Sequence, residues 1–97
     1  MKKVAKPRVY VELRALWGND DAESTIKVSR RRWESIRAGA AYVTSAWSWY
    51  EGKRYPVSWS FSNGKVSIDG EDGRQCIVEE PVDYLMAQVV GSNREFR

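Results

Sequence analysis

Apolar side chains recur at every second position between residues 42 and 78, and glycine-containing turns interrupt this alternation. A period of two places successive side chains on opposite faces of a strand, which is typical of a sheet with one buried face. Two dipeptides in this stretch, Asn63-Gly64 and Asp72-Gly73, favour the two-residue type I′ turns of β-hairpins. The alternation therefore predicts an antiparallel β-meander, and it restricts the possible fold more than any other feature of the chain.

The Asn63-Gly64 turn also predicts the register of its hairpin. A two-residue loop pairs Phe61 with Val66 and Trp59 with Ile68, so that the four side chains share one face. A slip of one residue would pair Trp59 with a polar residue. We therefore expect these four side chains to lie in the core.

The turn before this hairpin allows two registers. A two-residue Glu51-Gly52 loop sets Trp47 against Pro56, whereas a three-residue loop over 50–52 sets Trp47 against Tyr55. The longer loop keeps the apolar face continuous, and we prefer it for that reason. The core face of this strand then carries Val43, Trp47 and Trp49.

The first third of the chain predicts two strands and a helix. Alternation over residues 8–17 indicates a half-buried strand, and residues 25–28 form a short second strand. Ser29 is a suitable N-cap for a helix over residues 29–38, and Gly39 supplies its end.

A second helix is predicted after Pro81, a residue that suits the first turn of a helix. Its apolar residues follow helical spacing: Val82, Leu85, Met86, Val89 and Val90. The element order is then β-β-α-β-β-β-β-α. Successive strands with few helices indicate an α+β fold, here a single antiparallel sheet with two short helices packed on one face.

The length of 97 residues is that of one domain. We assign residues 8–91 to this α+β domain, residues 1–7 to a flexible N-terminal arm and residues 92–97 to a flexible C-terminal tail. The arm is basic but no apolar run follows it, so it does not read as a secretory signal, and no apolar run is long enough to cross a membrane. A cytoplasmic protein without membrane contact is expected.

Composition argues against catalysis. The chain has no histidine, which removes the commonest general base and the commonest zinc ligand. Cys76 is the single cysteine, so no intramolecular disulfide can form. Glycine-rich phosphate loops, zinc signatures, RNP motifs and helix-turn-helix spacing are absent from the sequence, and no known family is recognised. We therefore predict a small protein that is not an enzyme and holds no cofactor and no metal.

Arg30, Arg31 and Arg32 occupy the first turn of the predicted helix, where the helix dipole disfavours cations. Residues 1–37 carry 10 basic and 5 acidic side chains, so this part of the chain is basic. The three arginines and the basic arm would suit a nucleic acid or another polyanion. The alternative is a solvated turn in which Arg30 pairs with Glu34.

Five Trp, five Tyr and two Phe make up 12% of the chain. Aromatic rings on an open sheet, interleaved with Lys53, Arg54 and Arg74, would form a stacking platform for single-stranded nucleic acid. A small domain must also build its core from its large apolar side chains, and we prefer this second interpretation. Indole rings exposed beside a basic groove would favour the first.

The face opposite the predicted core carries Tyr10, Tyr42, Ala46 and Tyr50. Tyrosine is enriched at protein interfaces, although scattered exposed tyrosines are also common. The leading hypothesis is thus a protein-interaction or self-associating module, with a homodimer formed through this face. Polyanion binding is the alternative, and a small-ligand pocket between helix and sheet is the third hypothesis.

Overall fold

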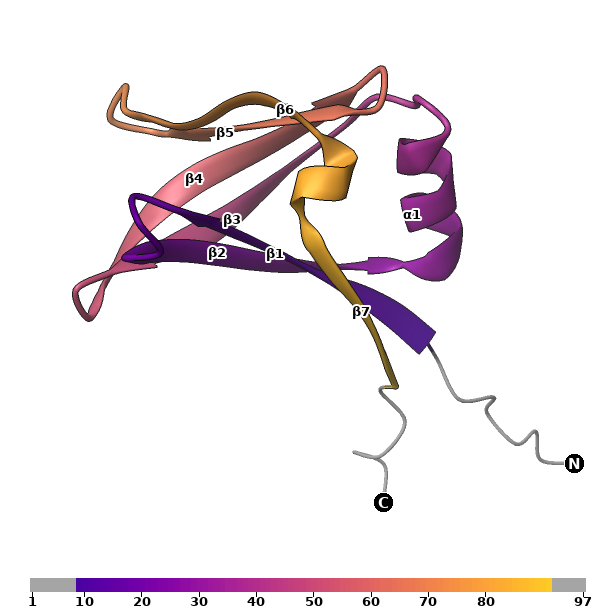
Figure 1. The fold of residues 1–97 in the computed structure, drawn as a ribbon, viewed down its shortest axis with the longest axis horizontal. Helices are drawn as coiled ribbons and strands as arrows, with labels where there is room; N and C mark the ends of the chain where they lie inside the picture. The colour runs from indigo at the N-terminus through magenta and orange to yellow at the C-terminus, as the bar shows by residue number, and fades with distance from the viewer. Residues whose placement is uncertain (1–8, 92–97) are drawn as a thin grey trace, which may run out of the picture.

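The computed structural model describes residues 9–91 as one antiparallel sheet that curls into a half-barrel (Figure 1). Its elements are β1 (Val9–Trp17), β2 (Ala22–Ser29), α1 (Arg30–Arg37), β3 (Tyr42–Tyr50), β4 (Lys53–Ser62), β5 (Lys65–Gly70), β6 (Gln75–Pro81), the 3₁₀ turn η1 (Val82–Tyr84) and β7 (Met86–Gly91). The strand order is β6-β5-β4-β3-β2-β1-β7. The proposed arm and tail lie outside the described residues.

The predicted meander and first helix are confirmed. Across the Asn63-Gly64 turn, Phe61 pairs with Val66 and Trp59 with Ile68. Helix α1 begins after Ser29, whose hydroxyl accepts a hydrogen bond from the backbone N–H of Arg32 at 3.0 Å. This cap satisfies one of the amide groups that a helix leaves unpaired at its start.

The predicted turn between β3 and β4 is wrong. The loop contains two residues, Glu51 and Gly52, and Trp47 pairs with Pro56. This register turns the even-numbered residues of β3 inward and the odd-numbered ones outward, the reverse of the expected faces. Small inward residues suit this position because Trp59 and Phe61 of the paired strand β4 already fill the interior of the half-barrel. The inward positions of β3 hold Tyr42, Thr44, Ala46 and Ser48.

Glu51 offers a direct test of this turn. Its φ is +52° and that of Gly52 is +78°, as a type I′ turn requires, but glutamate adopts positive φ with strain. We expect Glu51→Asn to stabilise the fold by about 0.5–1 kcal/mol, because asparagine tolerates this conformation better. The measurement is the midpoint of urea unfolding. Glu71→Asn removes the same charge at an exposed residue without positive φ, and an equal gain there would contradict the explanation.

The predicted second helix is also wrong, and with it the placement of two helices on one face of the sheet. Residues 82–84 form a single 3₁₀ turn, and residues 86–91 form β7, which pairs antiparallel with β1. The spacing of three between Val82 and Leu85 fits a 3₁₀ turn and brings both side chains into the core. Pairing with β7 also provides hydrogen-bond partners for an edge of β1 that would otherwise be open. Over residues 9–91 the fold is thus a curled, mostly β structure with one α-helix.

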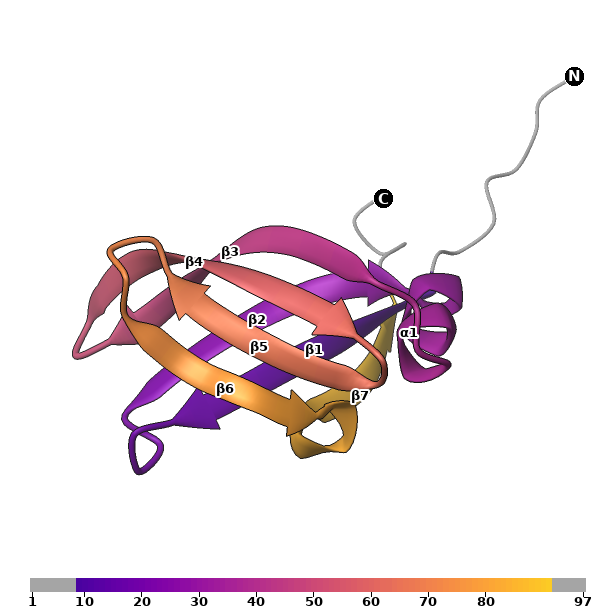
Figure 2. The ribbon, with the colours of Figure 1, turned by 90° about the horizontal axis from the view of Figure 1, so that it is seen from above.

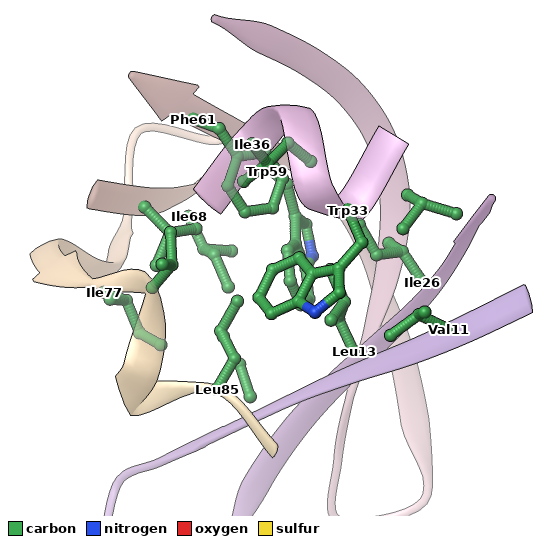
Figure 3. Packing of buried hydrophobic residues seen from close by; sticks show 14 of the residues in the cluster. Val11, Leu13, Ile26, Trp33, Ile36, Trp59, Phe61, Ile68, Ile77 and Leu85 are labelled. Carbon is green, nitrogen blue, oxygen red and sulfur yellow. The ribbon is translucent and has the colours of Figure 1, made fainter. Parts of the chain in front are cut away.

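The core fills the concave side of the half-barrel and is closed by α1 at one end (Figure 2). Trp33 of α1 points into the middle of the cluster, with Leu13, Trp59 and Leu85 around it (Figure 3). The buried Trp59 donates from Nε1 to the hydroxyl oxygen of Ser24 at 2.9 Å. That hydroxyl donates in turn to the carbonyl oxygen of Trp47 at 2.8 Å, which ties β2 to β3 beside the site described next.

Candidate functional site

Strands β2 and β3 pair over three residues only. The pairs are Ala22 with Tyr50, Glu23 with Trp49 and Ser24 with Ser48. Beyond Ser24 the two strands separate toward α1, which connects them (Figures 1 and 2). Within the described residues, no ladder pair joins residues 25–29 to residues 42–47. The sheet is therefore split along this line.

A groove of about 340 Å³ occupies the split, and we call it the β2–β3 groove. It is lined by Thr25, Ile26, Lys27, Thr44, Ser45, Ala46, Trp47 and Trp49. Ile26 and Ala46 belong to the inward face and connect the groove to the core, whereas the two tryptophans lie on the outward face. Its volume lies within the range of about 300–1,000 Å³ that is typical of ligand sites.

The two groove tryptophans are half-exposed, with 46% of Trp47 and 47% of Trp49 accessible to solvent. The guanidinium carbon of Arg54 lies 4.2 Å from the ring centroid of Trp47, which is a cation–π contact. A second hollow, of about 410 Å³, lies between Trp47 and Pro56 and includes Glu71. Trp47 thus lines hollows on both of its sides.

Charges around the groove are mixed. The two ion pairs among the described residues join Arg14 to Glu23 at 2.7 Å and Arg74 to Asp72 at 3.3 Å. Neither includes Lys27, which lines the groove, or Arg54, which contacts the Trp47 ring. The groove therefore offers apolar surface and positive charge together, with the Glu71 carboxylate in the adjoining hollow.

The four residues predicted to form an interface do not share one surface. Tyr42 and Ala46 pack against the core from the inward face of β3. Tyr42 stacks on Phe61, with ring centroids 6.2 Å apart. Tyr50 is exposed at the end of β3, and Tyr10 lies on β1. Of the four, Ala46 alone lines the β2–β3 groove, and the role of the set in self-association stays a prediction.

The three arginines of the first helical turn are exposed. The guanidinium carbon of Arg32 lies 4.3 Å from the ring centroid of Tyr42, so this side chain is directed toward β3. Among the described residues, Arg30 and Arg31 form no ion pair, and the pairing considered between Arg30 and Glu34 is not formed. Anion binding at this turn stays a prediction.

Three titratable groups among the described residues have shifted pKa values. Burial raises the pKa of the Cys76 thiol, which keeps it protonated and poorly nucleophilic at neutral pH. The Glu51 carboxylate raises the pKa of Tyr50, and the backbone N–H of Arg74 lowers the pKa of Asp72. Over residues 9–91, no three acidic or cysteine side chains gather closely enough to hold a metal ion.

The exposed indoles were missed because the face of β3 was assigned from the wrong turn. A signal for the correct face exists in the sequence: Thr44, Ala46 and Ser48 are small, and Thr44 is the strand partner of the buried Trp59. The split between β2 and β3 has no comparable signal in the sequence.

No protein family, curated protein or solved structure matches this chain. None of the helical segments in the described part of the chain has the length and hydropathy needed to cross a bilayer. The geometry of the β2–β3 groove is therefore the basis for inferring a function.

Proposed function

We propose that this protein is a non-catalytic protein-interaction module that binds an extended segment of a partner protein in the β2–β3 groove. The observation that carries the proposal is the early end of the β2–β3 ladder beside two exposed tryptophans. An extended segment placed there would meet backbone hydrogen-bonding groups and apolar anchors at the same time.

The backbone of the split strands favours a peptide as the ligand. Residues 25–29 remain paired with β1 on one side, and residues 42–47 remain paired with β4. Their groups that face the groove have no ladder partner among the described residues. Added strands recognise such edges through main-chain hydrogen bonds and take specificity from alternate side chains. A single segment in the groove could pair with either strand.

The tryptophans supply the anchors. Tryptophan and arginine are the residues that most often dominate the binding energy of protein interfaces. Trp47 is accessible from two hollows and is braced by Arg54, so little side-chain freedom remains to be lost on binding. In the ligand, an acidic residue would complement Lys27 and Arg54, and an apolar residue next to it would contact the tryptophans.

The test starts from a display library of random 12-residue peptides selected on the full chain. Affinities of the selected peptides are then measured by fluorescence anisotropy for the original protein and for Trp47→Ser. We expect Trp47→Ser to weaken binding by about 30-fold, the equivalent of losing one hot-spot contact. Val78→Ser, an exposed apolar residue on β6, is the matched control and should leave affinity unchanged.

The binding mode has its own readout. Methylating the peptide amides one at a time removes one main-chain donor each, and binding to strand edges predicts losses at every second position. Losses without this period, or equal effects of Trp47→Ser and Val78→Ser, would refute an added strand in the groove.

Single-stranded nucleic acid is the second candidate, because the bare indoles lie beside Lys27 and Arg54. Bases stack on exposed aromatic rings, and such binding weakens steeply with salt. A poly-thymidine oligonucleotide is the probe. Binding that falls with added salt and is lost in Trp47→Ser would indicate that the groove binds a nucleic acid and not a peptide. Loss in an Arg30/Arg31/Arg32→Ala variant instead would place polyanion binding at the first turn of α1.

A further inference from the structure

The two edges of the sheet differ in their protection. β6 and β7 are the end strands. On β6, Glu79 has a φ of +48° and the register with β5 shifts, which are the marks of a bulge. Glu79, Glu80 and Pro81 add two charges and one residue without an N–H. Bulges, charges and prolines are the devices by which proteins prevent pairing at an edge.

β7 has none of these devices. Its six residues, Met-Ala-Gln-Val-Val-Gly, include no charged side chain and no proline. No residue of β7 has a positive φ. Its apolar side chains are accessible, with 47% of Met86 and 56% of Val89 exposed. The strand is paired with β1 along its whole length, and no strand within residues 9–91 pairs with its other edge.

We infer that the open edge of β7 pairs antiparallel with β7 of a second copy of this chain. Two antiparallel copies of one strand are related by a twofold axis, so each copy supplies the donors and acceptors that the other needs. The strand is uncharged, so no like charges meet across the contact, although each chain carries a net charge of +3. An uncharged strand offers no attraction to a charged partner, whereas a second copy is complementary to β7 in backbone groups and in apolar side chains.

The side chains of β7 select one register. Ala87 and Val89 pair with Leu13 and Val11, so they lie on the core side of the sheet, and their neighbours lie on the outer side. A twofold axis at any residue of β7 keeps the two core sides together. No such axis pairs more residues than the one at Gln88, which sets Ala87 against Val89 of the other copy. It also sets Met86 against Val90, and Gln88 against itself. Every apolar side chain then meets an apolar side chain.

The experiment is sedimentation equilibrium of the full chain over a concentration series, compared with Val89→Lys and Val78→Lys. The two valines are exposed on opposite edge strands, at 56% and 62%, so the two variants make the same change in matched settings. We expect a reversible dimer of about 10 μM affinity, as for other small interfaces. Val89→Lys should weaken it by at least about tenfold, because it places like charges across the contact, and Val78→Lys should not change it.

Amide hydrogen exchange supplies a readout that does not depend on the variants. If the edges pair, protection of the β7 amides rises with protein concentration, while protection in β6 does not change. Circular dichroism verifies folding, and Met86→Lys repeats the test at a second site on β7. A monomer at all concentrations, or a dimer weakened by Val78→Lys and not by Val89→Lys or Met86→Lys, would overturn the inference. Trp47→Ser should leave the dimer intact, so this inference and the groove can fail separately.

Discussion

Trp59→Ala is expected to lower the free energy of unfolding by about 3–5 kcal/mol, the usual cost of deleting a buried aromatic side chain. Trp59 has 0% of its surface exposed. Its indole N–H bonds the Ser24 hydroxyl, so the substitution leaves a large cavity and also removes a buried hydrogen bond. Domains of this size have a total free energy of unfolding of about 5–15 kcal/mol, so this single substitution would remove a large share of it. Urea unfolding followed by circular dichroism measures the change.

Trp47→Ala is the matched control, because the same atoms are removed from the neighbouring strand. Trp47 is 46% exposed and lies outside the core, so its loss should cost about 1 kcal/mol or less, including the contact with Arg54. If the two variants were equally unstable, β3 would present Trp47 to the core. A small cost would also show that any binding lost with Trp47 is not caused by unfolding.

Local sequence was sufficient at the Asn63-Gly64 turn and at the ends of α1. It was not sufficient at Asp72-Gly73, because Asp72 lacks the positive φ of a type I′ turn and residues 71–74 connect β5 to β6. Asn63-Gly64 fits a type I′ turn and no competing loop, so the faces of Trp59 and Phe61 followed from counting residues. Ser29 and Gly39 bounded α1 for a similar reason, since a cap and a stop act within one turn. In these segments the local preferences agree with the packing of the whole fold.

Local sequence was not sufficient for β3. Loops of two and of three residues are both acceptable around Gly52, and the choice reverses every side chain of the strand. The outcome depends on volume in the interior, where Trp59 leaves space for Thr44 and not for another indole. That information is located on the partner strand. The β2–β3 groove depends on residues still farther apart in the sequence, because α1 separates the two strands that flank it.

The prediction of a helix in the C-terminal segment was wrong for a different reason. Apolar residues at positions 82, 85, 86 and 89 match one face of a helix. In the structure the first belongs to η1, the second lies between the two elements, and the last two belong to β7. The 3₁₀ turn accounts for the first interval of three, and the strand that follows buries almost none of its side chains. An edge strand with both faces accessible shows no clean alternation, so periodicity cannot distinguish it from a short helix.

Leu85→Ala tests this assignment, with an expected loss of about 2–4 kcal/mol in the free energy of unfolding. Leu85 is 7% exposed and packs against the core from the segment between η1 and β7. Its backbone N–H bonds the carbonyl of Val82 at 3.0 Å, so the side chain is held in place by the 3₁₀ turn. Urea unfolding in dilute solution, where self-association does not contribute, measures the loss.

Met86→Ala is the discriminating control. In a helix over residues 82–91, Met86 would lie on the buried face beside Leu85, and its truncation would cost a similar amount. On β7, Met86 is 47% exposed on the outer side of the sheet, so the expected cost is about 0.5 kcal/mol or less. Comparable losses for the two variants would support a helix over residues 82–91. They would also contradict the open edge of β7 on which the proposed dimer depends.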